Sequence, residues 1–460
     1  MPSKLGTAAL ALLLLGAGGT SPEERVFRPL SLNLCTEACA EENKKAEGEA
    51  TGLSLEECLA LALENHPSLR KAKGGTRGAA ASLEQIRAQN RMTLSLTGSA
   101  SYKGDYEEWS DRAHSETVSL TASKLLYDTG RNRLSQESRR EALLGEQENE
   151  RQVQVTVAAN AKRAYYDLVL KILNRDVEQE KLKNLQEHLE KARGLYEVGN
   201  SPFIDVTKAE SDAAGAQVSL LKAENDILVS REALKVAMGT DPGGALDLAL
   251  PTKLLLPRPA EGVEALLAAA LEDRPDYRQL LHTLRARELD IKNAARNDSP
   301  TLKGTLGSDL SKREGSSATT NYSVGLNLTI PIADGGATAA GVESARAQRD
   351  QTSADLEALR QKVSYGVRSA ALSLSNAIER VRSAGASVQY AEENLDLARG
   401  RYEVGVGTAL ELSDAVSQLA SSRYTYYQAL YDAQTARADL DEAMGHLPPE
   451  IEGSDHHAGN

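Results

Sequence analysis

The sequence predicts a mainly α-helical protein with a transmembrane β part, built from two tandem copies of one unit. The nine residues ARGLYEVGN at 192–200 return as ARGRYEVGV at 398–406, with seven of nine positions identical. Each copy also combines a very long proline-free stretch of helical period with segments in which apolar and polar residues alternate. The copies span 53–240 and 261–446, and a proline-marked linker at 241–260 joins them.

The composition fits helix packing and gives no sign of catalysis. The chain is 41% hydrophobic but has only one Trp and two Phe, so Ala, Leu and Val must form the core. A net charge of −13 argues against a nucleic-acid partner, because phosphate backbones bind basic surfaces. The motifs HExxH, GxSxG, CxxC, GxGxxG and the Walker loop are absent. We therefore expect no enzyme, no cofactor and no metal site.

The first 20 residues have the pattern of a cleaved secretory signal. Lys4 precedes a short apolar run that ends in small residues, and the run is too short for a membrane-spanning helix. Residues 21–52 are polar and charged without a sustained period, which predicts a flexible N-terminal extension, and 447–460 predicts a flexible tail.

Three cysteines lie near the start of the exported chain. Cys35 and Cys39 can form a local disulfide or remain thiols, and both interpretations are favoured over a metal site. Cys58 lies on an amphipathic segment with leucines, where we expect it to be packed. The sequence does not determine how the three cysteines pair.

Each copy begins with a short helix and a second helix that starts at a proline. The second helix is expected to run from His66 to about Arg91 in the first copy and from Arg274 to about Ser299 in the second. Alternating segments then predict β-hairpins at 93–127 and 301–332. The last strand places six apolar side chains on one face, namely Tyr322, Val324, Leu326, Leu328, Ile330 and Ile332. Its length suits a strand that crosses a bilayer in a tilted barrel, although a soluble sheet could have the same alternation.

Long helices are expected at 130–198 and 336–404, followed by return helices at 202–238 and 408–444. Apolar residues at 3,4 spacing continue along both long helices, which indicates coiled-coil packing. A helix of this length spans roughly 100 Å. In each copy, the summed length of the helix before the β-hairpin and the return helix nearly equals the length of the long helix. The two shorter helices can therefore stack end to end and pack antiparallel along the long one.

Two turns complete the helical hairpins, at Val198-Gly199 and Val404-Gly405. Glycine takes positive φ where a helix must stop and reverse. The four strands of one chain cannot close a barrel, and open edges are excluded in lipid. The chain must therefore oligomerise, into eight strands as a dimer or twelve as a trimer, and an aqueous passage favours the larger.

The paired repeats, the two hairpins, the long alanine-rich helices and the doubled YEVG turns resemble the TolC-type outer-membrane efflux proteins over residues 53–446. The resemblance implies a homotrimer in the outer membrane of a Gram-negative-type bacterium, with a 12-stranded β-barrel in the lipid and a 12-helix α-barrel across the periplasm. It also implies a passive, gated exit duct for efflux or type I secretion, used by an inner-membrane pump and a periplasmic adaptor protein. The adaptor would contact Val198, Gly199, Val404 and Gly405.

A structural periplasmic or surface coiled-coil protein without a pore is the alternative. The alternating strands and the signal favour the duct, because a filament needs no lipid-facing band. Cargo, pump and adaptor are not determined by the sequence.

One pair of positions breaks the symmetry of the repeat. Asp205 and Lys208 follow the first turn and can neutralise each other, whereas the equivalent Glu411 and Asp414 have no basic counterpart. In a trimer these two carboxylates would form stacked acidic rings, which the resemblance places at the periplasmic aperture. Charges that are merely solvated on a helix face are the plainer interpretation.

The resemblance also implies a gate. It assigns Tyr402 to the contacts that hold the tip closed, with Asp205 as the acidic partner. Gly407 stands where the best-known members of the family have an Arg. How this chain holds its tip closed without that Arg stays open.

Overall fold

The computed structural model describes residues 53–103, 113–199, 201–241, 256–260, 262–313 and 315–448, all within the unit Gly52–Asn460. The predicted signal, the N-terminal extension, Cys35, Cys39 and residues 449–460 of the predicted tail lie outside the described residues, as does most of the linker.

The helices and strands follow one another in the same order in both copies. The first copy contains α2 (Leu55–Asn65), α3 (Pro67–Ala88), β1 (Thr93–Lys103), β2 (Ala113–Tyr127), α4 (Arg131–Glu197) and α5 (Phe203–Met238). The second contains α6 (Val263–Asp273), α7 (Pro275–Ala294), β3 (Thr301–Arg313), β4 (Thr319–Thr329), α8 (Ala337–Glu403) and α9 (Ala409–Met444). Both α4 and α8 have 67 residues, and both α5 and α9 have 36.

Local chemistry explains where the long helices start. At the start of α4, the Asp128 carboxylate accepts hydrogen bonds from the backbone N–H of Gly130, at 3.0 Å, and of Asn132, at 2.6 Å. In the second copy, Asp334 accepts from Gly336 at 2.9 Å and from Thr338 at 2.6 Å. Each aspartate satisfies backbone donors that the first helical turn leaves free.

The helix before each hairpin ends earlier than its pattern predicts. The first was expected to run to residue 91, but α3 ends at Ala88, and hydrogen-bonded turns at Asn90 and Arg91 follow it. The second was expected to run to about Ser299, but α7 ends at Ala294, with similar turns through Ser299. Helical periodicity continues into these turns because successive turns keep nearly helical spacing.

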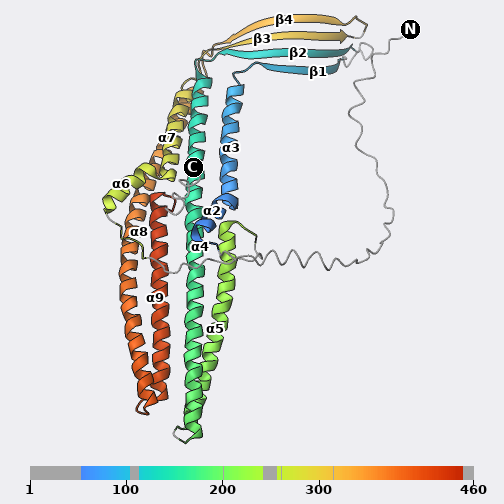
Figure 1. Ribbon diagram of the computed structural model, residues 1–460. Helices are drawn as coiled ribbons and strands as arrows, with labels where there is room; N and C mark the ends of the chain where they lie inside the picture. Colours follow the sequence, from blue (N-terminus) through green and yellow to red (C-terminus); the bar gives the residue numbers. More distant parts are fainter. Residues whose placement is uncertain are drawn as a thin grey trace, which may run out of the picture. The chain divides into compact units, whose positions relative to one another are not determined.

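The shorter helices meet end to end beside the long ones (Figure 1). A Cβ on Gly239, just after α5, would lie 2.6 Å from the Cα of His66, just before α3. Gly445 lies as close to Arg274 and Pro275 at the start of α7. Only glycine allows this approach, so each return helix stops directly against the helix that precedes the hairpin.

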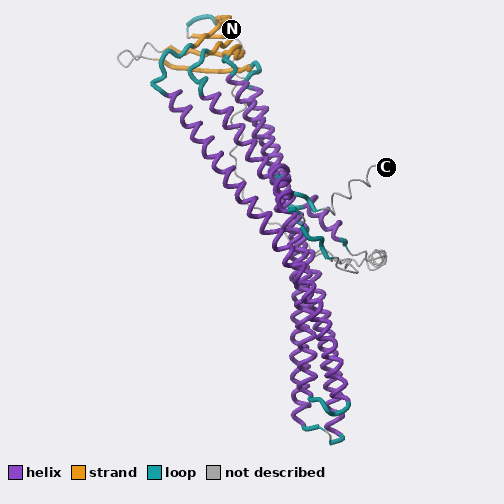
Figure 2. Tube along the Cα trace, turned by 90° about the vertical axis from the view of Figure 1, so that its left-hand side faces the viewer, coloured by secondary structure: helices purple, strands orange, loops and turns teal. Residues whose placement is uncertain are grey.

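Contacts between the copies tie the helices into one body (Figure 2). Besides its partners α3 and α5, α4 packs against α7 and α9 of the second copy. Figure 2 shows the helices running side by side. A hydrogen bond of 2.7 Å from Ser138 to Asp290 joins α4 to α7, and one of 2.6 Å from the Tyr424 hydroxyl to Glu178 joins α9 to α4. The helix α4 therefore lies between α3 and α7 over one part and between α5 and α9 over the other, and α8 flanks α7 and α9.

Small residues form much of the helical core. Alanine, leucine and valine dominate the buried clusters between α8 and α9 and around the two turns. Cys58 is fully buried against Tyr165 and Leu168, in agreement with the expectation that it is packed.

The strands form one antiparallel sheet in the order β1-β2-β3-β4, so that β2 and β3 join the two copies. The apolar face predicted for the last strand is exposed, with Val324 at 84% of its full accessibility. The strand is shorter than the predicted hairpin at 301–332, because β4 ends at Thr329 and leaves Ile330 and Ile332 outside the sheet. Pro331 follows Ile330 and has no N–H to donate to a neighbouring strand. Among the described residues, the outer strands β1 and β4 each pair with a strand on one side only. Among the described helices, none has the length and apolar character needed to cross a membrane.

Candidate functional site

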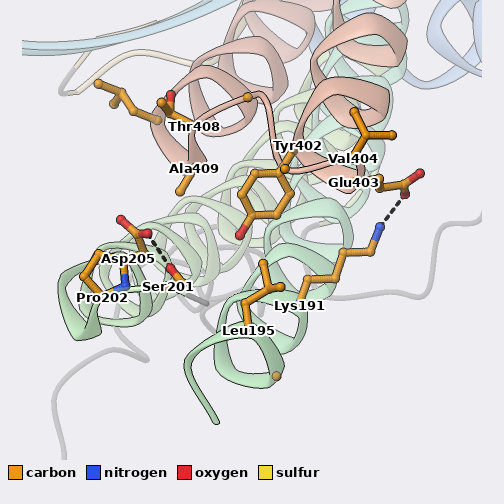
Figure 3. A pocket seen from close by; sticks show the side chains of 14 residues that line it. Lys191, Leu195, Ser201, Pro202, Asp205, Tyr402, Glu403, Val404, Thr408 and Ala409 are labelled. Carbon is orange, nitrogen blue, oxygen red and sulfur yellow. Dashed lines mark hydrogen bonds and ion pairs between the residues drawn. The ribbon is translucent and has the colours of Figure 1, made fainter. Parts of the chain in front are cut away.

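The two hairpin turns lie together and enclose a groove of about 910 Å³. Lining residues come from the end of α4, the start of α5, the end of α8 and the start of α9. Figure 3 shows Tyr402 pointing from α8 into this groove, with its hydroxyl toward the side where Asp205 and Ser201 lie. The sequence-predicted Tyr402, Asp205, Val404 and Gly405 are all part of this lining.

The first turn reverses the chain through a left-handed glycine. Val198 ends α4, and its N–H donates to the carbonyl of Gly194 at 3.3 Å. Gly199 has φ +77°. Pro202 then caps α5 with extended backbone, and Ser201 Oγ donates to Asp205 Oδ2 at 2.5 Å. The helix thus stops and restarts within a few residues, as the sequence requires for a hairpin.

In the second turn, two successive N–H groups share one acceptor. The N–H groups of Val406 and Gly407 both donate to the carbonyl of Arg401, at 3.0 and 2.9 Å, and Gly405 has φ +76°. A Cβ on Gly407 would lie 2.9 Å from the backbone N of Tyr402. The turn therefore has no room for the side chain of an Arg at 407 without moving its own backbone.

Glu411 and Asp414 lie exposed on the first turns of α9, three residues apart and thus on one face. Glu411 also caps the helix. Thr408 Oγ1 accepts from the N–H of Glu411 at 3.1 Å, and the Glu411 carboxylate accepts from the N–H of Thr408 at 3.4 Å.

The expectation that this acidic pair has no basic counterpart is wrong for Glu411. Arg401 Nη2 lies 3.6 Å from Glu411 Oε2, and both side chains are about half exposed. Arg401 lies in the last turn of α8, before the hairpin turn. The sequence comparison covered only the equivalent positions after the two turns, so it did not detect this partner. An ion pair of this length between exposed groups is weak.

The expected pairing of Asp205 with Lys208 is also corrected. Lys208 Nζ forms a short contact with Asp212, one helical turn further along α5. Asp205 is held by Ser201 instead. Both acids lie within one helical turn of Lys208, and Lys208 pairs with Asp212, which the neighbouring helix α9 partly covers.

Three polar contacts in the described part of the chain join the first helical hairpin, α4 and α5, to the second, α8 and α9, near the turns. Lys191 of α4 and Glu403 of α8 form an ion pair of 2.7 Å. Ser413 of α9 donates to Asp212 of α5 at 2.6 Å. Arg399 of α8 donates to Asn184 of α4 at 3.1 Å. These contacts hold the second helical hairpin against the first.

The electrostatics of these contacts follow from their partners. The hydrogen bond from Lys191 lowers the pKa of the Glu403 carboxyl. Burial opposes the charge of Asp212, but hydrogen bonds from Lys208 and Ser413 outweigh it and hold the pKa of Asp212 below its ordinary value. Both carboxylates therefore stay charged at neutral pH.

Beneath the groove, Tyr402 packs edge to face on His188 of α4, with ring centroids 5.1 Å apart. Both side chains are buried, with exposed fractions of 8% and 3%. Burial raises the pKa of Tyr402, and the charge of Asp205 raises it further. Burial lowers the pKa of His188.

Sequence reasoning missed His188, Lys191, Asp212 and Ser413. His188 adjoins the apolar seam of α4, next to Leu185 and Leu189, and a polar residue inside such a seam is a signal that could have found it. The other three are ordinary polar residues of amphipathic helices, which only their partners distinguish. Among the described residues, no three His, Cys, Asp or Glu side chains are grouped to hold a metal ion.

Known relatives share this architecture. The chain is 25% identical over 411 residues to the probable efflux pump outer membrane protein TtgC of Pseudomonas putida, with 85% of this chain and 83% of TtgC covered. It is 24% identical over 469 residues to the cation efflux system protein CusC of Escherichia coli K12, with 96% and 99% covered.

Solved structures show the same fold at lower identity. The CmeC outer membrane channel of Campylobacter jejuni superposes with a TM-score of 0.73 at 16% identity, over 95% of this chain and 98% of CmeC. The open state of the MtrE outer membrane channel of Neisseria gonorrhoeae superposes with a TM-score of 0.69 at 21% identity, and the match covers 85% of this chain and 89% of MtrE. The family model described as outer membrane efflux protein matches residues 58–240 and 266–446. Since this match covers both copies of the repeat, the chain belongs to the outer membrane efflux protein family.

Proposed function

We propose that this protein is the gated exit duct of a tripartite efflux or type I secretion system. In this proposal three copies form a 12-stranded β-barrel and a 12-helix tunnel, which closes at the hairpin turns. The family to which the chain belongs places it in the outer membrane as an efflux component, not as an enzyme.

The sheet carries the proposal. Its two outer strands, β1 and β4, each have one edge that no other described strand pairs with, and the apolar stripe of β4 is exposed. In lipid, unpaired backbone groups cost several kcal/mol each, so another copy must pair with each edge. Twelve strands from three copies enclose an aqueous passage, whereas eight are filled by side chains.

The flanks of the helical part support the same assembly. Exposed apolar side chains lie along α5 and α8, including Leu221, Leu228, Leu372, Tyr390 and Leu397. These two helices make no contact with each other within the described elements. Side-by-side copies would bury these apolar side chains, and removing apolar surface from water favours association.

The turns fit the contact with a periplasmic adaptor. Val198, Phe203, Ile204, Val404, Val406 and Leu410 are exposed apolar side chains around the two turns. We propose that this apolar tip binds the adaptor, which connects the duct to an inner-membrane pump. Glu411 and Asp414 would form the acidic rings of the aperture, and Tyr402 and Asp205 would take part in its closed state. The names of TtgC and CusC, an efflux pump component and an efflux system protein, support this role.

Conductance tests the proposal. The purified protein, reconstituted into planar bilayers, should give channels that prefer cations. Val324→Arg places a charge on the proposed lipid face and should destabilise the barrel by about 2–4 kcal/mol, with loss of channels. Asn327→Arg, on the opposite face of the same strand, is the matched control and should still give channels. Absence of any conductance, or equal behaviour of the two variants, would contradict a lipid-embedded duct.

A further inference from the structure

His188 of α4 is a buried histidine next to the groove-lining Tyr402. Its Nδ1 is buried and has no hydrogen-bond partner within the described residues, and the same holds for the hydroxyl of Tyr402. The two rings meet edge to face at 5.1 Å. The contact joins α4 of the first hairpin to α8 of the second.

Charged groups face His188 from the surrounding helices. On α4, Lys191 lies one turn further and is paired with Glu403 of α8. On α5, Asp205 and Asp212 act on the imidazole, and Lys208 pairs with Asp212. From α8 comes Tyr402, and from α9 Ser413, which holds Asp212. Two carboxylates thus lie near an imidazole that is buried beside an aromatic ring.

We propose that His188 positions Tyr402 in the closed tip and releases it on protonation, so that acid loosens the contact between the two hairpins. This inference rests on the proposed duct function. The contact between His188 and Tyr402 would help to keep the tip closed without an Arg at position 407.

The chemistry of the two protonation states supports the proposal. Neutral imidazole can present a ring edge to Tyr402, but imidazolium has two N–H donors, and both require acceptors when buried. Asp205 and Asp212 are the acceptors at hand. An imidazolium ring of His188 that turns toward these carboxylates loses its contact with Tyr402. If it donates to Asp212, it also competes with the hydrogen bond that Ser413 of α9 donates there. One proton therefore weakens two contacts between the hairpins.

The sign of the effect follows from linkage. Burial, with a smaller effect from Lys191, holds the pKa of His188 in the closed tip below its ordinary value, although Asp212 and Asp205 act in the opposite direction. A histidine in an opened, hydrated tip has a pKa near its ordinary value of about 6.5. The proton thus binds more tightly to the open tip. The contribution of His188 to closure is therefore fully present above about pH 6.5 and is lost as pH falls below it. The closed-to-open ratio falls by at most about tenfold per protomer for each pH unit.

The experiment measures the open fraction of the reconstituted channel at about pH 7.5 and about pH 5.5, on either side of the ordinary histidine pKa. The background variant Glu411→Gln with Asp414→Asn removes these two carboxyl groups from the proposed aperture. We expect the open fraction to rise at least severalfold on acidification. His188→Phe keeps an aromatic ring but cannot take up a proton, and should lose this response.

His282→Phe is the matched control. His282 accepts or donates a hydrogen bond of 2.8 Å with Glu141 where α7 packs on α4, away from the turns, and its loss should leave the acid response intact. If His188→Phe fails to assemble, His188→Gln takes its place. The background variant is informative without either substitution, because a background channel whose open fraction does not rise on acidification already contradicts the proposal.

The outcomes separate this inference from the duct function. Channels that conduct but do not respond to acid, or a response that survives in His188→Phe or His188→Gln, would overturn the role of His188 and leave the duct intact. Loss of the response in His282→Phe would also overturn it. A protein that conducts at neither pH would contradict the duct itself.

Discussion

The hydroxyl of Ser413 shows how a single residue can hold the two hairpins together. It is 6% exposed and donates to the charged Asp212 across the boundary between α9 and α5. Hydrogen bonds to charged groups contribute about 1.5–3 kcal/mol. If this bond is made only in the closed tip, Ser413→Ala should raise the open-to-closed ratio of the channel by about tenfold or more, measured as open fraction in planar bilayers.

Ser421 provides the comparison for Ser413. It lies exposed on the same helix, two turns further on, and Ser421→Ala changes the same atoms at the surface. The open fraction of Ser421→Ala should equal that of the unchanged protein. Equal effects of the two substitutions would show that helix α9 responds to serine loss in general, and that the bond to Asp212 does not hold the tip.

Glu411 and Asp414 carry a second prediction at the scale of the residue. Six carboxylates around an aperture in a trimer would concentrate cations, and oxygen ligands from several subunits can share a multivalent ion. Glu411→Gln with Asp414→Asn should lower the cation preference and weaken block by trivalent cations added at the periplasmic side. Gln at 411 can still serve the capping box, so α9 should stay intact.

A matched pair of acids elsewhere controls for total charge. Glu272 and Asp273 are exposed at the end of α6, away from the turns. Glu272→Gln with Asp273→Asn removes the same charge and should change neither selectivity nor block. If both double variants behave alike, Glu411 and Asp414 are solvated helix charges without a role in the aperture.

At the scale of the element, the helical hairpin depends on one backbone conformation at its turn. Gly405 has φ +76°, and a Cβ there would meet no atom within 4 Å, so the constraint is conformational alone. Left-handed backbone costs other residues roughly 1–2 kcal/mol, and β-branched residues more. Gly405→Val should therefore impair export by cells that carry it, while trimers still reach the outer membrane.

Gly400 allows a control within the same helical hairpin. It is exposed in the last turns of α8, its backbone is not left-handed, and a Cβ there would meet no atom of a neighbouring element within 4 Å. Gly400→Val should leave export close to normal. Normal export by Gly405→Val would contradict the importance of the turn, and loss of trimers would assign the turn to folding.

At the scale of the whole molecule, β1 and β4 each pair with one strand among the described residues, so the proposed barrel needs strands from neighbouring copies. We expect the protein extracted in detergent to be a trimer, because each chain supplies four strands and a wide passage needs about twelve. Sedimentation that corrects for bound detergent measures the protein mass directly. A stable, folded monomer would rule out a barrel shared between chains.

The elements and their order could be predicted from the sequence. Periodicity indicated the helices and the strand faces, and the glycines in the turns marked where the long helices stop. These features depend on residues close together in the chain, so one sequence is enough to read them. The resemblance pointed to the outer membrane efflux family, which the family model confirms.

Which side chains meet depended on the packing of the helices in three dimensions. From the sequence, we expected Lys208 to pair with Asp205 and Glu411 to have no basic partner. In the structure, Lys208 pairs with Asp212, and Arg401 approaches Glu411. Long charged side chains can reach several neighbours on a helix, and the rotation and stagger of the packed helices select among them. His188 meets Tyr402 for the same reason, because two helices far apart in the sequence place their rings at one level.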